Sequence, residues 1–375
     1  MTRPASPDDV IDTRHTHSVD DDGWYSVSKA EISDSSPRRS ARAGERRLAP
    51  DDETLARSGK LDRYNGECAF CMYGSSAIII HTNPDPEEPS ETASIRYFRV
   101  AEFHQLMSTD QETVWLEGGG HRKIFWSKIW YQHPDRKTYS GIAFEPEVEM
   151  LPRGYYNLYK GFPISPEPSP APSGELAVRN YLRLLKEGVA CGDEAVYEYL
   201  LNWMALAIQK PWVKPEVAII LKGERGDGKN VACRVFGKLF GNHYKVISHP
   251  KRFSNSFNTL VANCILLFVD KAVRCENDIK ILKNLIAEPF VSLEYESGNS
   301  LAFKSYLHIM MSTDDELRLK KGDRRLLHLV TDSKFHGDTA FFATIVDGMR
   351  DGGDRHLMHF FLQRGSSHFD CRAMA

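Results

Sequence analysis

VAIILKGERGDGKNV, residues 217–231, is the stretch that decides the fold. Its apolar run over residues 217–221 predicts a buried strand, and a glycine-rich turn over residues 223–230 follows. The turn fits the phosphate-loop pattern G-x-x-x-x-G-K, but Asn230 stands where Ser or Thr is expected at the next position. Because glycines let backbone N–H groups curl around a polyphosphate, the stretch predicts a strand, an anion-binding loop and a helix.

The chemistry of this loop assigns its residues to a nucleotide. We expect contacts from Gly223, Gly226, Asp227, Gly228, Lys229, Asn230 and Val231. Lys229 supplies a point charge to the β- and γ-phosphates, and the following helix offers its positive N-terminus. Asn230 lacks the hydroxyl that usually binds Mg²⁺, although its carbonyl oxygen can partly substitute.

Length and composition limit the class of protein. The 375 residues allow two or three domains, and 41% hydrophobic residues are enough for a sizeable core. The net charge of -3 gives no global nucleic-acid signature. The polar N-terminus argues against a secretory signal, and the apolar runs are too short to span a bilayer, so no membrane contact and a cytoplasmic location are expected.

The cysteines predict a reducing compartment and no zinc site. Of the seven cysteines, Cys68 and Cys71 form the only close pair, and no second pair completes a zinc site. We interpret both as strand or core thiols.

The chain divides into four regions. Residues 1–58 form a polar tail that we predict to be disordered, and its basic patch over residues 35–47 is interpreted as a solvated tail rather than a polyanion contact. Residues 59–162 predict a small α+β domain, and residues 163–174 a Pro-rich linker. Residues 175–375 predict a helical lead-in and an α/β domain.

Aromatic residues in the second region have two interpretations. Trp126, Trp130 and Tyr131 lie close to the basic pair Arg136 and Lys137. Aromatic residues mixed with cations can stack on bases, but they can equally form the core of a small domain. We favour the core.

Strands alternating with helices predict a doubly wound sheet in the last region. Helices are expected over residues 175–186, 193–209, 277–287, 339–349 and 354–364, and strands over 217–221, 244–247, 264–269, 291–295, 306–312 and 326–330. Asp193 is a candidate N-cap. The strand over residues 264–269 is apolar on both faces and ends in Asp270, where a metal-holding carboxylate is needed. Asp270 is therefore the predicted catalytic carboxylate and, with Asn230, the predicted metal ligand.

An ordered set of motifs resembles one family. The set comprises Trp130 with residues 136–146, residues 156–162, Trp203-Met204-Ala205, Gln209-Lys210-Pro211, the glycine loop, Phe257-Asn258, residues 267–270, residues 282–286 and Asp323-Arg324-Arg325. It resembles the helicase-like domain of phage and plasmid replication proteins, which is often fused to primase-polymerases. The resemblance implies a P-loop NTPase of the AAA+ class, akin to superfamily 3 helicases. It also implies ATP and Mg²⁺ as cofactors, single-stranded DNA and a primase or polymerase as partners, and a homo-oligomeric ring.

The resemblance also assigns further site residues. A polar sensor at the end of a later strand corresponds to Ser312-Thr313, so Thr313 is a predicted catalytic residue. Arg324 or Arg325 resembles an arginine finger that reaches a neighbouring subunit's nucleotide. Where the family has a Glu that activates water, this chain has Lys271, and Asp314 or Asp315 is left as an alternative carboxylate.

These departures predict a site that binds better than it hydrolyses. A general base contributes about 10²–10⁴ in rate, whereas Lys229 and the glycines are kept. We therefore expect an ATP-binding, helicase-like replication protein of a phage or mobile element, acting in a ring, with hydrolysis weak or lost. The alternative is a non-hydrolysing nucleotide- or DNA-binding assembly module derived from such a helicase. Whether the chain is an enzyme is left open by the sequence.

Overall fold

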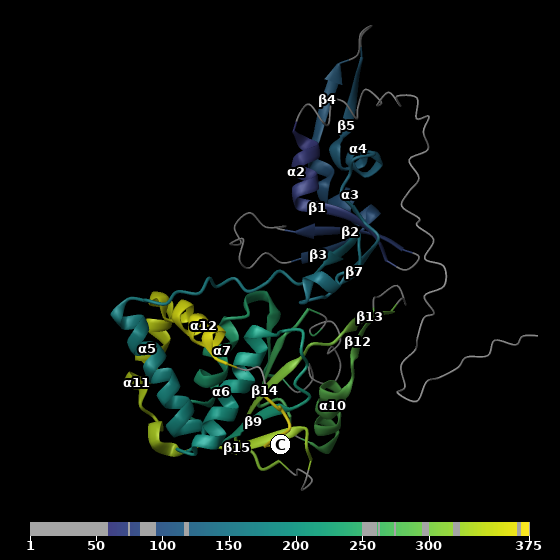
Figure 1. Cartoon of the computed structure of the whole chain (residues 1–375). Coiled ribbons are helices and arrows are strands. Elements are labelled where there is room, and N and C mark those ends of the chain that lie inside the picture. Colours follow the sequence, from purple (N-terminus) through teal and green to yellow (C-terminus); the bar gives the residue numbers. More distant parts are fainter. Residues whose placement is uncertain are drawn as a thin grey trace, which may run out of the picture. The chain divides into compact units, whose positions relative to one another are not determined.

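The structure is a computed structural model, and it describes residues 59–73, 76–82, 95–115, 120–249, 261, 263–273, 275–294, 300–317, 323–365 and 369–374 (Figure 1). The chain divides into two units, Met1–Ala49 and Pro50–Ala375, and all described residues belong to the second. The predicted tail, residues 1–58, lies outside the described residues. So do residues 257 and 258 of the motif set.

A four-stranded sheet forms the first part of the described chain. Its strand order is β3-β2-β1-β6, in which β1 pairs antiparallel with β2 and parallel with β6. The elements here are α2 (Lys60–Glu67), β1 (Cys68–Tyr73), β2 (Ser76–Thr82), β3 (Ile95–Arg99), α3 (Val100–Leu106), η2 (Met107–Thr109), β4 (Gln111–Trp115), β5 (His121–Phe125), α4 (Trp126–Gln132) and β6 (Thr138–Tyr139). β4 and β5 form a separate antiparallel hairpin.

The aromatic and cysteine residues of this part lie in its core. Trp126 and Trp130 are fully buried, and Tyr131 is half-buried with its ring 5.8 Å from that of Phe70. The interpretation of these aromatic residues as core is therefore confirmed for the two tryptophans. Cys68 is buried on β1, and burial raises the pKa of its thiol to about 12. No group of three or more potential metal ligands occurs among the described residues.

A connecting stretch follows this sheet. β7 (Gly141–Ala143) pairs in parallel with β8 (Tyr155–Asn157), and η3 (Val148–Met150) lies between them. β6 and β7 are separated only by Ser140. Asn157 holds the turn, because its side chain accepts hydrogen bonds from the N–H groups of Glu145 and Tyr159, both at 3.0 Å.

The predicted α/β arrangement is confirmed by a five-stranded parallel sheet. Its order is β10-β11-β14-β9-β15, with β9 (Ala218–Lys222), β10 (Tyr244–Ile247), β11 (Leu266–Asp270), β14 (His308–Thr313) and β15 (Leu326–Val330). Alternate residues of β9 enter two cores: Ile219 and Leu221 pack in one, Ala218 and Ile220 in the other. A strand buried on both faces needs apolar residues throughout, which explains the continuous apolar run.

Helices cover both faces of this sheet. They are α5 (Pro172–Arg183), η4 (a π-helix, Leu184–Val189), α6 (Glu194–Gln209), α7 (Lys229–Lys238), η5 (Gly241–His243), α10 (Glu276–Ala287), η6 (Ser333–Phe335), α11 (Thr339–Gly348), η7 (a π-helix, Met349–Gly353) and α12 (Asp354–Gln363). In Figure 1, α5, α6, α7, α11 and α12 lie to one side of the sheet and α10 to the other. A hairpin of β12 (Phe290–Glu294) and β13 (Ser300–Lys304) precedes β14.

Two helices begin at residues that favour a helix N-terminus. Asp193 caps α6 as predicted, because its Oδ1 accepts from the N–H groups of Ala195 and Val196 at 2.8 and 3.1 Å. α5 begins at Pro172, inside the region predicted as linker. A proline suits the first turn of a helix, because N–H groups there have no partner within the helix and its missing N–H costs no hydrogen bond. None of the helices in the described ranges is long and apolar enough to cross a membrane.

Candidate functional site

The glycine loop joins β9 to α7 at the carboxyl edge of the parallel sheet. β9 ends at Lys222, and α7 begins at Lys229 with Gly228 as its N-cap. Gly226 and Gly228 have φ values of +109° and +87°, a region that favours glycine. The sequence pattern therefore places glycine where the backbone must turn to reach the helix.

Gly223 is required for a different reason, which is space. A Cβ added there would lie 1.9 Å from Oγ1 of Thr331 and 2.7 Å from Oδ2 of Asp227. Thr331 follows β15, and its N–H donates to the carbonyl oxygen of Lys222 at 2.7 Å. The start of the loop is thus pressed against the end of β15.

Asp227 braces the loop from within. Its side chain is buried, and Oδ2 accepts a hydrogen bond from the N–H of Glu224 at 2.6 Å and lies 3.4 Å from Oγ1 of Thr331. Its Oδ1 lies 2.9 Å from Nδ1 of His336. Since a carboxylate only accepts, Nδ1 is the donor. Asp227 was predicted to contact the nucleotide, and in the structure its carboxylate contacts Glu224, Thr331 and His336.

A pocket of about 580 Å³ opens beside the loop. This volume suits a small-molecule ligand. Its walls comprise Arg225, Gly226, Gly228, Lys229, Asn230, Val231, Ser248, Asp270, Lys271 and Phe342. Five of the seven residues predicted for the nucleotide line it, together with Asp270. Gly223 and Asp227 do not line the pocket.

Lys229 is buried at the inner end of the pocket. Its Nζ donates to the carbonyl oxygens of Gly223 and Glu224 at 2.7 and 2.6 Å, and it lies 3.2 Å from Oδ1 of Asp314. An ammonium has three protons, so these partners use all of them. An incoming phosphate would displace Asp314 from the Lys229 ammonium, because the contact with Asp314 is the longest of the three.

Asp270, at the end of β11, is surrounded by hydrogen-bond donors. Its Oδ2 accepts from Nδ2 of Asn230 at 3.0 Å and from Nη2 of Arg234 at 3.1 Å. Its Oδ1 accepts from Oγ of Ser312 at 3.0 Å. Ser312 lies directly across from Asp270 on β14. The carboxylate is therefore held by two neutral donors and one cation.

The groups around Asp270 do not fit the predicted Mg²⁺ ion. Mg²⁺ takes oxygen ligands in near-ideal octahedral geometry. Here the guanidinium of Arg234 approaches one carboxylate oxygen, and Asn230 turns a donor nitrogen, not an oxygen, toward the same atom. A divalent cation at Asp270 would be repelled by the guanidinium, which stays charged at any ordinary pH.

Lys271 also lines the pocket, and it pairs with Asp314, which does not. Lys271 adopts a left-handed backbone conformation with φ of +54°, and its ammonium pairs with Oδ2 of Asp314. Burial raises the pKa of the Asp314 carboxyl, but hydrogen bonds from Lys271 and Lys229 outweigh it, so the pKa lies below its usual range. A carboxylate held this way is a weak base.

Thr313 is buried, and its hydroxyl contacts the turn that directly follows β14. Oγ1 accepts from the N–H of Asp315 at 3.0 Å. Ser312, its neighbour, is the residue that reaches Asp270. Successive side chains on a strand point to opposite faces, so only one of this pair can do so.

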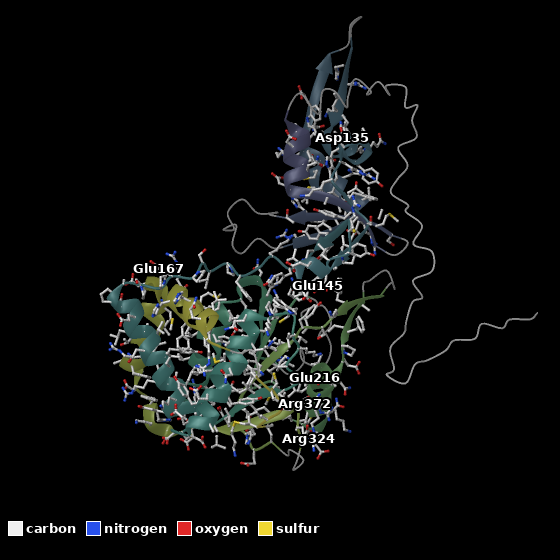
Figure 2. All side chains as sticks on the ribbon, viewed as in Figure 1. Asp135, Glu145, Glu167, Glu216, Arg324 and Arg372 are labelled. Carbon is white, nitrogen blue, oxygen red and sulfur yellow. The ribbon has the colours of Figure 1, made fainter. Side chains whose placement is uncertain are left out.

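Arg324 and Arg325 lie at the opposite edge of the sheet from the glycine loop. They precede β15, and the carbonyl oxygen of Arg325 accepts from the N–H of Ala218, the first residue of β9. Glu216, which comes just before β9 and is labelled in Figure 2, pairs with Arg372. Arg324 is exposed, and Nε of Arg325 lies 3.4 Å from Oδ1 of Asp323. Neither lines the pocket beside its own glycine loop.

An aromatic cluster flanks the loop on the side of α11. Phe342 lines the pocket, and a Cβ added at Gly228 would lie 2.7 Å from its Cε1. Its ring packs edge-on against Phe341 at 5.6 Å, and Phe341 stacks on Phe335 at 4.3 Å. Arg183 lies 5.3 Å from the Phe335 ring. Phe342 is thus a half-buried aromatic surface held in place beside the loop.

Sequence reasoning missed several residues of this site. Arg234 follows Asn230 by four residues, so helical spacing alone would have placed it on the same face of α7. Ser312 was noted only as the partner of Thr313. His336, Thr331 and Phe342 carry no local signal, because they reach the loop through the fold of the chain after β15.

The comparisons with known proteins agree with this fold. Residues 221–325 match the model of a family of unknown function, DUF5906. An apo structure of the C-terminal region of NrS-1 superposes with a TM-score of 0.61 at 16% identity, covering 88% of this chain and 73% of that one. A second apo form of that region gives a TM-score of 0.59 at 16% identity, covering 84% and 71%. No curated protein matches the sequence. At this identity the likeness shows the fold.

The arrangement offers three chemical capacities. The glycine loop and the start of α7 present backbone donors to an anion, with the Lys229 ammonium behind them. The cations Arg225, Lys229 and Lys271 can balance several negative charges. Phe342 offers an apolar face to a planar group.

Proposed function

We propose that this chain binds a nucleoside triphosphate, with ATP as the predicted ligand, and that it hydrolyses the ligand weakly or not at all. One observation carries the proposal. Lys229, the first residue of α7, is buried in the pocket beneath a glycine loop at the carboxyl edge of a parallel sheet. In open α/β sheets this edge is where ligands bind, and a helix N-terminus with a lysine suits a polyphosphate.

Weak hydrolysis follows from the groups around the pocket. Lys271 stands where the resembled helicases have the carboxylate that activates water. The nearest alternative, Asp314, is paired with Lys271 and Lys229, which lowers its pKa and with it its strength as a base. Loss of a general base costs about 10²–10⁴ in rate, whereas the phosphate-binding groups are untouched.

The test compares two lysines of the same helix. ATP affinity is measured by calorimetry for the wild-type chain, for Lys229→Ala and for Lys238→Ala, which removes an exposed lysine at the end of α7. We expect Lys229→Ala to weaken binding at least about tenfold, because a hydrogen bond to a charged group contributes about 1.5–3 kcal/mol, and Lys238→Ala to leave it unchanged. Equal affinity of all three proteins would refute the nucleotide site.

A second measurement addresses hydrolysis. Phosphate release is followed with ATP in excess, with and without single-stranded DNA. We expect a rate far below the 1–10³ s⁻¹ that is typical of enzymes. An ordinary rate that Lys229→Ala abolishes would contradict the weak-hydrolysis part and leave the binding part standing.

An active helicase-type ATPase is the second candidate, and Asp314 favours it. Its carboxylate lies 3.2 Å from Lys229, within reach of a γ-phosphate held there. If Asp314 orients the attacking water, Asp314→Asn abolishes phosphate release without strengthening ATP binding. If Asp314 only competes for Lys229, the same substitution strengthens ATP binding.

The partners implied by the family resemblance belong to the same proposal. We propose single-stranded DNA, a ring of identical subunits and a primase or polymerase partner, in the replication of a phage or mobile element. Sedimentation with and without ATP and a single-stranded oligonucleotide tests the first two. A chain that stays monomeric and binds no DNA in either condition favours the alternative, a nucleotide-binding assembly module.

A further inference from the structure

Arg234, whose side chain is half exposed, gives Asp270 a positive partner. It follows Asn230 by one turn of α7, and its Nη2 lies 3.1 Å from Oδ2 of Asp270. Its guanidinium also lies 5.8 Å from the centre of the Phe268 ring on β11. The cation is thus held between α7 and the strand that carries the carboxylate.

Arg234 does not itself line the pocket, but the pocket that Asp270 lines is also rich in positive charge. Arg225, Lys229 and Lys271 line it, and Asp270 is the only carboxylate among the described lining residues. Asp314, the next carboxylate, is shared between Lys229 and Lys271. A triphosphate carries several negative charges, and in other proteins a metal ion neutralises part of them. Here side chains of the protein are placed to do so.

We propose that this pocket binds a nucleoside triphosphate as the free anion, with the Arg234 guanidinium taking the electrostatic place of Mg²⁺ beside Asp270. The inference rests on the proposed nucleotide site and names the ligand's form. It follows that a metal-loaded nucleotide binds less well than the free one, because the ion would meet Arg234 and Lys271. Mg²⁺ in solution then competes with the protein for the ligand.

The test measures ATP affinity of the wild-type full chain by calorimetry in excess EDTA and in millimolar Mg²⁺. We expect binding in EDTA to be tighter than in Mg²⁺. The comparison needs no variant, so a folding defect cannot affect it. Tighter binding in Mg²⁺ overturns the inference and leaves the proposed nucleotide site intact, whereas absence of binding in both solutions overturns both.

Arg234→Gln then assigns the effect to this residue. Glutamine keeps a hydrogen-bond donor but removes the charge, and Lys238→Gln removes an exposed cation one turn further along α7 as the matched control. We expect Arg234→Gln to weaken ATP binding in EDTA about tenfold and to make Mg²⁺ strengthen binding. Lys238→Gln should behave as the wild type under both conditions. Binding in EDTA that Arg234→Gln leaves unchanged overturns the role of Arg234.

Discussion

Nδ1 of His336 lies 2.9 Å from Oδ1 of Asp227, so a residue beyond the last strand of the sheet holds the inside of the glycine loop. Asp227 is buried and also accepts the Glu224 N–H at 2.6 Å. The loop is therefore shaped by the chain after β15 as much as by its own glycines. This explains why a carboxylate can lie in a loop proposed to bind anions. Its charge interacts with the N–H of Glu224 and with Nδ1 of His336.

Asp227→Ala should loosen the loop. It removes the hydrogen bond from the N–H of Glu224 to the buried carboxylate, and a hydrogen bond to a charged group contributes about 1.5–3 kcal/mol to the free energy of unfolding. ATP binding should weaken as well, because the loop loses this contact. Urea unfolding and calorimetry measure the two effects. His336→Ala should be milder, and should add little in the Asp227→Ala background, because the two residues act through one contact. Additive losses would contradict the coupling.

Gly223→Ala should destabilise the chain through a steric conflict with Thr331. The new Cβ would lie 1.9 Å from Oγ1 of Thr331, and overpacking typically costs about 1–3 kcal/mol. Thr331→Ala removes that atom, so the double variant should regain part of the loss in urea unfolding. Gly66→Ala is the control, since nothing lies within 4 Å of a Cβ there and the position is in α2. Gly66→Ala should stabilise by about 0.5–1 kcal/mol.

Asp314→Asn should strengthen the binding of a polyphosphate. The substitution frees the ammonium groups of Lys229 and Lys271, which line the pocket, and removes the negative charge that pairs with them. We expect the Kd for ATP to fall about tenfold, in line with the 1.5–3 kcal/mol of a charged hydrogen bond. Asp315→Asn is the control for charge in the same turn. Weaker binding by Asp314→Asn would show that this carboxylate supports the ligand instead of competing with it.

Phe342→Ala should separate binding of the base from binding of the phosphates. Stacking of a base on an aromatic ring contributes about 1–3 kcal/mol, so ATP affinity should fall about tenfold. Inorganic triphosphate, which has no base, should bind Phe342→Ala and the wild type equally. If both ligands lose affinity alike, Phe342 acts through its packing on Gly228 and not through the base.

His308 should make the free energy of unfolding decrease as the pH is lowered. Burial is the main cause that lowers the pKa of His308 to about 4, whereas the unfolded chain has an ordinary value near 6.5. Between these values the unfolded state binds a proton that the folded state does not, so the free energy of unfolding decreases as pH falls from 6.5 to 4. The loss at pH 5 is about 2 kcal/mol.

Urea unfolding at pH 7 and pH 5 of the wild type and of His308→Gln isolates this contribution. Other buried histidines, such as His243, whose pKa burial also lowers, remain in both proteins and cancel in the difference. An equal pH dependence of the two proteins would show that His308 does not titrate as its burial implies.

Much of the fold follows from local sequence patterns. The apolar run, the glycines and Lys229 predict β9, the loop and α7, and these form where expected because each rests on short-range rules of burial and backbone conformation. The apolar strand that ends in Asp270 is equally local. α5 begins earlier than predicted, since a proline was interpreted as a linker residue although it also suits a first helical turn.

The details of the site depend on contacts that are distant in sequence. Ser312 meets Asp270 because β14 is inserted between β11 and β9, an order that no local pattern specifies. Thr313 is predicted as a catalytic residue, and strand alternation brings its neighbour Ser312, not Thr313, to Asp270. Arg234 is the exception, because helical spacing from Asn230 would have revealed it.

The separation of Arg324 from the glycine loop has a consequence for assembly. The arginine lies at the amino edge of the parallel strands and the loop at their carboxyl edge, so an Arg324 that touches a nucleotide must come from a second copy. Such a contact joins the amino edge of one copy to the carboxyl edge of the next, and when it repeats head to tail it leads to a closed ring or an open filament. In a mixture of subunits, an Arg324→Ala copy would then impair its neighbour's pocket while its own pocket, served by an intact neighbour, stays complete.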